Sequence, residues 1–364
     1  MPTATSSGSR GNIVAALGKP LGALAIALGI VALALAVLGA NPAATFAALL
    51  SGAFGNWLAA TDTLVKATPL VFTGLAVSAA FSGALWNIGA EGQLLFGALA
   101  AAACGVHLAQ WPRPPAIAVV LGAGTAAGAV AGALCGWLRA RFAVSEIIST
   151  IMLNFIAVQA LSWAVHGPLM EPSRAYPVSQ ALPPAACLYR FLPPSRLNAG
   201  MIAALALAPA CYVWLFYTNA GFELRALGKN PRAAAFFGVP VGRVAVFAMG
   251  LSGAMAGLGG AVQLSAISHR LFERFSPGWG YEAIAVALVA RLNPLAVVPS
   301  ALLFGALDNG AQAIQRAQGV SPVLVQAAQG LVIFVLLAFD TPVLASWRRR
   351  GAVREDLASG RADA

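Results

Sequence analysis

The chain has 364 residues, of which 59% are hydrophobic and 9% are charged, and its mean hydropathy is +0.80. Because so few polar side chains could not cover a water-exposed surface, this composition excludes a soluble globular protein. The formal net charge of +10 comes from basic residues scattered among loop ends, which is typical of the positive-inside bias of a membrane protein and argues against a nucleic-acid partner.

Ten apolar windows approach or reach the length of about 20 residues that a transmembrane helix needs. They lie near residues 21–40, 64–85, 93–110, 115–138, 147–166, 200–217, 243–267, 279–291, 294–313 and 322–345. A further apolar piece, residues 43–60, contains Gly52, Gly55 and Asn56, and we expect it to lie at the membrane interface. The sequence therefore predicts an all-α polytopic membrane protein with about ten transmembrane helices.

The topology follows from the termini and the basic residues. Residues 1–20 are polar and mildly basic, and the window after them is longer than the apolar core of a cleaved signal peptide, which predicts a retained first span. Placing both termini in the cytoplasm puts most of the 22 basic residues on that side. We expect a transmembrane domain over residues 21–345 and a charged tail over 346–364, whose arginines 348–350 would lie beside anionic lipid headgroups.

The stretch GALWNIGAEGQ, residues 83–93, places Trp86, Asn87, Glu91 and Gln93 between two apolar windows. Its glycines permit a break in the helix, so these four side chains could line a solute pathway at depth in the membrane. Alternatively, the stretch lies at the cytoplasmic surface and Glu91 caps the N-terminus of the next helix, where a carboxylate is favoured. The sequence leaves both interpretations open.

Other polar residues near the apolar windows carry similar alternatives. Ser145 and Glu146 are explained as a helix N-cap and its first turn. For Asn154, packing between helices is favoured over lining a pathway, because a buried amide must find partners. Asp308, in FGALDNGAQ, is an embedded acid and a further pathway candidate.

Small residues cluster in residues 122–134 and 250–261, which predicts close helix approach, either within the chain or between two chains. The four cysteines and three histidines show no ligand spacing, so we expect no metal site and no disulfide framework. The chain also lacks a G-x-x-x-x-G-K-[ST] phosphate loop, a nucleophile elbow and a paired-carboxylate arrangement. We therefore expect no enzymatic activity in this chain.

Two long loops stand out. Residues 167–199 are rich in proline and are predicted to form an external, turn-rich connector or a contact for an extracytoplasmic partner. The predicted cytoplasmic loop 218–242 contains a short helix, with Asn230 as N-cap, Pro231 at its first position and Gly238 as its stop. Because a helix of about two turns is unstable alone, we expect it to dock on something.

Three motifs together resemble the permease subunits of ABC importers for nucleosides and simple sugars. They are GALWNIGAEGQ at 83–93, SEIISTIMLNFIA at 145–157 and GKNPRAAAFFGVPVGR at 228–243. The resemblance extends to the ribose and branched-chain amino acid permeases, and is greatest for the larger permease of nucleoside uptake systems. It implies a type II ABC importer-like fold in a prokaryotic plasma (inner) membrane.

The resemblance also implies partners and a coupling site. Residues 230–238 would be the coupling helix that inserts into the ATPase subunit, with Asn230, Pro231, Arg232, Ala233, Ala234 and Gly238 as its candidate residues. ATP and Mg²⁺ would bind that separate subunit, so no cofactor is expected on this chain. A second related permease, forming a heterodimer, and an extracytoplasmic solute-binding protein would complete the importer.

The resemblance favours nucleosides as the transported solute, with simple sugars such as ribose as the alternative. A second alternative is an ion-coupled transporter that works alone, which would need paired ionisable groups in the membrane. We consider this weaker, because the sequence shows no embedded histidine or lysine close to the few acids.

Overall fold

The computed structural model describes residues 29, 32, 41–191, 193–318 and 330. The predicted segment 1–20, the tail 346–364 and, apart from single residues, the first and tenth windows at 21–40 and 322–345 lie outside the described residues. The chain divides into two compact units, one of which is Leu50–Gly310. This unit contains all of the predicted site residues and is the one considered below.

Helices make up nearly all of the described secondary structure, together with three isolated β-bridges. In chain order they are α2 (Pro42–Phe54), α3 (Trp57–Ser82), α4 (Ala90–Gly105), α5 (Arg113–Phe142), α6 (Glu146–His166), η1 (Pro184–Ala186), α7 (Ala199–Tyr217), α8 (Asn219–Lys229), α9 (Pro231–Phe236), α10 (Val241–Gln263), η2 (Leu264–Ser268), α11 (Trp279–Val289) and α12 (Pro294–Gln318).

Within the described residues, six helical segments are long and apolar enough to cross a membrane: α3, α5, α6, α7, α12, and α10 joined to the π-helix η2. The all-helical, polytopic class is thereby confirmed. The number of ten spans and the sides of the two termini stay predictions.

Three predicted elements differ from the structure. Helix α3 begins at Trp57 rather than at 64, because the Asn56 side chain caps it by accepting a hydrogen bond from the Ala59 amide at 2.7 Å. Helices α4 and α11 have 16 and 11 residues. At a rise of 1.5 Å per residue they are about 24 Å and 17 Å long, which is shorter than the roughly 30 Å of a bilayer core.

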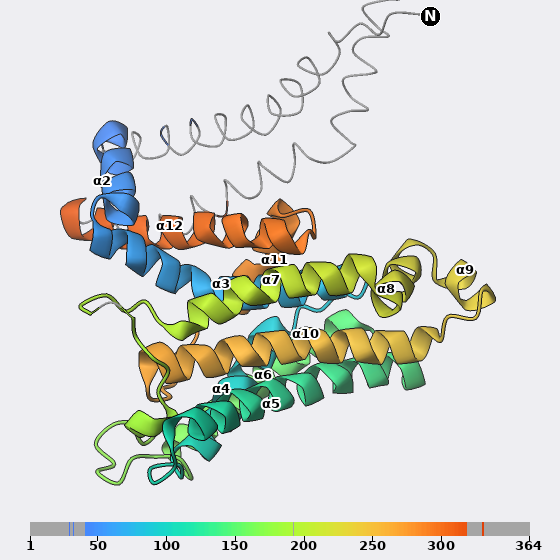
Figure 1. Cartoon of the computed structure of the whole chain (residues 1–364), viewed down its shortest axis with the longest axis horizontal. Helices are drawn as coiled ribbons and strands as arrows, with labels where there is room; N and C mark the ends of the chain where they lie inside the picture. Colours follow the sequence, from blue (N-terminus) through green and yellow to red (C-terminus); the bar gives the residue numbers. More distant parts are fainter. Residues whose placement is uncertain (1–28, 30–31, 33–40, 192, 319–329, 331–364) are drawn as a thin grey trace, which may run out of the picture. The chain divides into compact units, whose positions relative to one another are not determined.

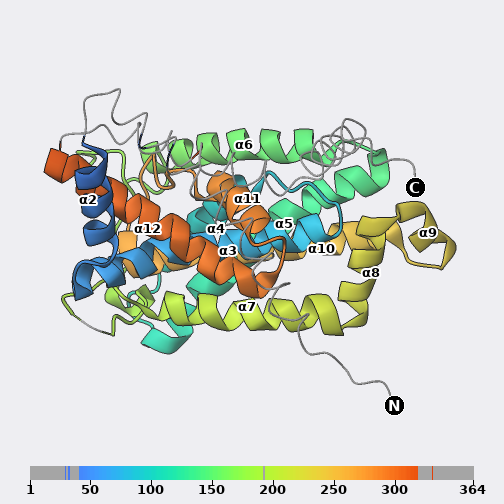
Figure 2. The same cartoon turned by 90° about the horizontal axis from the view of Figure 1, so that it is seen from above.

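Helix α3 lies at the centre of the unit, and most of its residues are buried. It packs against α7, α10 and α11, and α10 in turn packs against α4 and α5 (Figure 1). Figure 2 shows α6 and α7 on opposite sides of this central group. Most residues of α5, α6 and α7 are partly or fully exposed, and the apolar side chains among them suit contact with lipid.

The small residues of α5 and α10 meet each other. A methyl group at Gly128 of α5 would overlap the Gly253 carbonyl oxygen, and one at Gly257 of α10 would overlap that of Gly124. The predicted close approach is confirmed, and the structure answers the question that the sequence left open: the contact lies within one chain.

Two connecting segments lie at opposite ends of α10 (Figure 1). The loop that contains α9 comes just before the N-terminus of α10. The segment 167–198, which we call the strap, contacts the other end, where η2 continues α10. The strap amide of Leu182 donates to the His269 carbonyl at 2.8 Å, and that of Leu188 donates to the Ser265 carbonyl at 3.0 Å. As predicted, the strap is mostly extended and turn-rich, with one short helix, η1.

Candidate functional site

The N-termini of the two short helices α4 and α11 meet inside the unit. A Glu91 carboxylate oxygen accepts a hydrogen bond from the Gly280 amide at 2.7 Å, and both residues are buried. A methyl group at Gly280 would overlap the backbone of Glu91, so only glycine permits this approach. Gly278, with φ of +112°, provides the turn that leads into α11. We call this contact the half-helix junction.

The junction shows what Glu91 does in this fold. Its carboxylate caps the N-terminus of α11, where the helix dipole and the free amides favour a negative charge. A capping role was one of the two interpretations that the sequence left open, but the capped helix is α11 rather than Glu91's own helix. A role of Glu91 in the solute pathway stays a prediction.

Asn87 and Gln93 belong to a fully buried hydrogen-bond network beside the junction. The Asn87 amide nitrogen donates to the Gln93 carbonyl oxygen at 2.9 Å and to the Ser252 hydroxyl at 2.8 Å. The Ser252 hydroxyl donates to the Ala76 carbonyl at 2.6 Å. The network thus joins the irregular segment 83–89 to α3, α4 and α10. Trp86, by contrast, is half exposed, and its ring meets the Phe81 ring edge-on.

Asn154 connects α6 to the same place. Its carbonyl oxygen accepts from the Gly92 amide at 2.7 Å, and its nitrogen donates to the Ile88 carbonyl at 3.0 Å and the Tyr281 hydroxyl at 3.3 Å. These are the contacts between helices that the sequence favoured for this residue. Asn154 therefore holds the start of α4 in position, and a role in the pathway stays a prediction.

Asp308 forms an ion pair with Lys66 of α3, at 3.0 Å between nitrogen and oxygen. The Asp308 side chain is 45% exposed and that of Lys66 is 21% exposed. The sequence argument that no lysine accompanies the embedded acids is therefore wrong. It failed because the predicted window started at 64 and left Lys66 at a loop end, whereas α3 carries it well inside the helix.

The predicted cap of α6 is partly wrong. Ser145 occupies the N-cap position, but its side chain makes no capping hydrogen bond. Glu146 instead pairs with Arg139, in the last turn of α5. The turn between α5 and α6 is thus stabilised by this ion pair.

The short helix of the predicted coupling loop is confirmed. The Asn230 side-chain oxygen accepts hydrogen bonds from the amides of Arg232 and Ala233, both at 3.1 Å, and Pro231 is the first residue of α9. The helix ends at Phe236, and Gly238 takes the φ of +85° that stops it. The preceding helix α8 was not predicted; the Thr218 hydroxyl caps it by accepting from the Gly221 amide.

The surface of α9 is unusual for a short loop helix. Ala234 faces inward and is buried, whereas Phe236 and Phe237 are 86% and 82% exposed and contact each other edge-on. Sequence reasoning missed this aromatic pair, although two adjacent phenylalanines in a predicted cytoplasmic loop were a usable signal. It also missed Lys66, Ser252 and Gly280, whose roles depend on contacts far along the chain.

The capping role of Glu91 leads to a testable prediction. Glu91→Ala should destabilise the chain by about 1–3 kcal/mol, because the Gly280 amide would be buried without a partner. Glu91→Gln should retain most of the stability, since its amide oxygen can still accept that hydrogen bond. The thermal midpoint of the purified chain in detergent measures both. Equal midpoints for the alanine variant and the wild type would contradict the capping role.

The chain is similar to known transport proteins. A sequence model described as "Branched-chain amino acid transport system / permease component" matches residues 59–339. A glucose ABC transporter permease protein of Haloferax volcanii is 35% identical over 77% of this chain and 76% of its own length. A guanosine ABC transporter permease protein of Bacillus subtilis is 33% identical, over 87% and 92% of the two chains. A nucleoside ABC transporter permease protein of Lactococcus lactis is 29% identical, over 82% and 84%.

The Bacillus subtilis and Lactococcus lactis relatives each have a second permease that is also similar to this chain. A second guanosine ABC transporter permease protein of Bacillus subtilis is 27% identical to this chain, and a second nucleoside ABC transporter permease protein of Lactococcus lactis is 26% identical. Similarity to both members of a pair indicates that the two members are related to each other as well as to this chain.

Proposed function

The chain belongs to the family of permease components of branched-chain amino acid transport systems, and on that premise we propose that it is the permease subunit of an ATP-driven importer for nucleosides. The family match over residues 59–339 carries the assignment as a permease subunit. With its six long apolar helices among the described residues, the chain is a multi-pass protein of the prokaryotic plasma membrane. In this proposal the chain contributes part of the pathway by which the solute crosses the membrane, and ATP hydrolysis takes place in a separate subunit.

Nucleosides are favoured as the solute because relatives in Bacillus subtilis and Lactococcus lactis are named for guanosine or nucleoside transport. A simple sugar is the second candidate, and the Haloferax volcanii relative named for glucose supports it. The Lys66–Asp308 pair supplies the ionisable groups that an ion-coupled transporter would need. Family membership nevertheless favours coupling to ATP.

Helix α9 is the proposed contact for the ATPase subunit, in which ATP and Mg²⁺ would bind. It has an exposed aromatic pair and too few residues to be stable without support. In this proposal the α9 end of α10 faces the cytoplasm. The strap end then faces outward, where a solute-binding protein would deliver the solute.

We propose a second permease because the charged side chain of Asp308, in the membrane-spanning helix α12, is partly exposed. An aspartate side chain that is 45% exposed is costly in lipid, so its face should meet protein or a water-filled pathway. The paired relatives support a heterodimer. In this arrangement Asp308 and Trp86 can reach the pathway directly, whereas Asn87, Glu91, Gln93 and Asn154 hold the half-helix junction beside it.

The test is ATP hydrolysis by the complete importer in proteoliposomes. The chain is reconstituted with its ATPase, second permease and binding protein, and nucleosides and sugars are added in turn. We expect nucleosides to stimulate hydrolysis several-fold. Stimulation by sugars and not by nucleosides would contradict nucleosides as the solute and favour a simple sugar instead. Accumulation of solute by this chain alone under an ion gradient would contradict the proposed function.

A further inference from the structure

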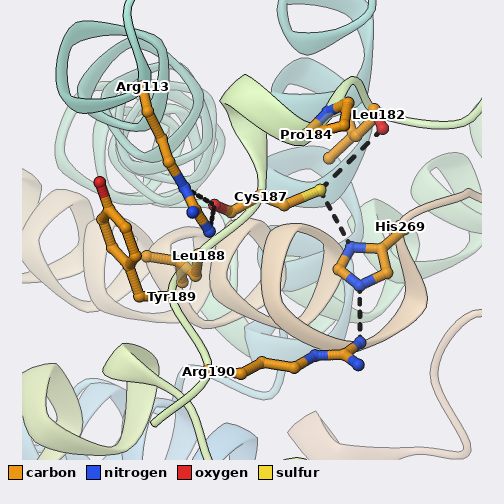
Figure 3. A pocket seen from close by; sticks show the side chains of 8 residues that line it. All are labelled: Arg113, Leu182, Pro184, Cys187, Leu188, Tyr189, Arg190 and His269. Carbon is orange, nitrogen blue, oxygen red and sulfur yellow. Dashed lines mark hydrogen bonds between the residues drawn. The ribbon is translucent and has the colours of Figure 1, made fainter.

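A cavity of about 610 Å³ lies at the strap end of α10 (Figure 3). Its walls come from the start of α5, from strap residues 182–190 and from His269, which follows η2. The charged side chains among its lining residues are Arg113 and Arg190, and no carboxylate lines it. The cavity therefore has a concentrated positive charge.

The arginines are held in place without being neutralised. Arg113 donates from Nε and Nη2 to the Cys187 carbonyl at 3.1 Å and 3.0 Å, and its guanidinium carbon lies 3.7 Å from the centre of the Tyr189 ring. Among the described residues, neither Arg113 nor Arg190 forms an ion pair. The nearby Arg270, in contrast, pairs with Glu171 at 2.7 Å.

His269 fixes the orientation of Arg190. The Arg190 Nη2 group donates to His269 Nε2 at 2.9 Å, and because arginine can only donate, Nε2 must be unprotonated. The imidazole proton therefore lies on Nδ1, which faces the Cys187 sulfur at 3.3 Å. Burial and the charge of Arg190 both lower the pKa of His269, so the ring stays neutral at neutral pH. The remaining N–H groups of the two arginines are left to bind an anion.

We propose that this cavity binds the phosphate group of a phospholipid headgroup. Arginine is well suited to phosphate because it offers several donors in a planar, permanently charged group. The apolar side chains of Leu182, Leu188 and Pro184 in the same cavity fit the glycerol and ester region that follows a headgroup phosphate.

The position of the cavity also favours a lipid. The candidate membrane span of α5 begins at Arg113. Tyr189 lines the cavity, Trp111 and Phe191 lie near lining residues in the sequence, and all three aromatic side chains are exposed. Aromatic side chains of this kind gather at the headgroup level of a bilayer. A soluble phosphate would gain nothing from these apolar surroundings.

The experiment measures the thermal midpoint of the purified full chain in detergent as a function of added phosphatidylglycerol. Diacylglycerol with the same acyl chains and inorganic phosphate are the two comparison ligands. We expect phosphatidylglycerol alone to raise the midpoint. Arg190→Gln and Arg113→Gln should each need about tenfold more of it for the same rise, because each loses one charged donor group. Arg196→Gln, an exposed strap arginine outside the cavity, is the matched control and should respond like the wild type.

An equal rise with diacylglycerol would overturn the proposal, because no phosphate would be needed. If inorganic phosphate raised the thermal midpoint as much as phosphatidylglycerol does, the bound phosphate group would not have to come from a lipid, and that part of the proposal would be overturned. Wild-type responses in both glutamine variants would also overturn it. If Arg190→Gln does not fold, the test rests on two other variants. Arg113→Gln has an amide nitrogen at the place of Arg113 Nε and can still donate to the Cys187 carbonyl. Arg190→Lys keeps the charge and should retain binding.

Discussion

Gly128→Ala should destabilise the chain by about 1–3 kcal/mol, the usual cost of overpacking, whereas Gly122→Ala on the same helix should not. An added methyl group at Gly128 would lie 2.8 Å from the Gly257 Cα and 2.9 Å from its nitrogen, and would also overlap the Gly253 carbonyl oxygen. All of these atoms are backbone, so no side chain can move away and the two helices must separate. A methyl group at Gly122 would lie more than 4 Å from every described residue outside its own stretch of helix, so Gly122→Ala should raise the stability by up to about 1 kcal/mol through helix propensity alone.

The measurement is the thermal midpoint of the two purified variants and the wild type in the same detergent. The sign of the change is what matters, because both substitutions are Gly→Ala in α5. Gly253→Ala, on the facing side of α10, should lower the midpoint as Gly128→Ala does, since its methyl would overlap the Gly128 carbonyl oxygen. Equal midpoints for Gly122→Ala and Gly128→Ala would show that the helices do not pack this closely.

The features that the sequence predicted correctly are those that depend on neighbouring residues. The short helix α9 was predicted from Asn230, Pro231 and Gly238, which lie within a few positions of one another, and the structure shows Asn230 as its N-cap and Gly238 just after its end. The all-helical membrane class follows from composition and from the length of the apolar windows. Close helix approach at residues 122–134 and 250–261 was predicted because small residues at helical spacing leave room for a neighbouring backbone, whereas the pairing of α5 with α10 came from the structure.

The half-helix junction could not be predicted, because its partners are far apart in the sequence. Glu91 and Gly280 are separated by 189 positions, and Lys66 and Asp308 by 242. A window of apolar residues reports hydropathy but not depth, so residues 93–110 and the shorter window 279–291 were both counted among the ten predicted spans. The polar groups at the starts of α4 and α11 are buried because they satisfy each other, which only the folded arrangement shows.

Replacing both Phe236 and Phe237 with alanine should reduce ATP-driven transport to less than about a tenth of the wild-type rate, while the chain folds normally. Both side chains are largely exposed, so their removal takes little from the core. At a docking interface, however, a buried aromatic anchor commonly contributes about 2 kcal/mol or more, which corresponds to more than tenfold in affinity. The readouts are copurification of the ATPase subunit with the chain and solute-stimulated ATP hydrolysis in proteoliposomes.

Phe222→Ala is the matched control, because Phe222 is an exposed phenylalanine on the neighbouring helix α8. It should leave both readouts unchanged if docking is confined to α9. Arg232→Glu, which reverses a charge at the start of α9, should weaken assembly as well, since its backbone cap is retained and only the outward-facing group changes. Wild-type assembly and transport in the double phenylalanine variant would exclude α9 as the docking element. The exposed aromatic pair would then have to contact something other than the ATPase.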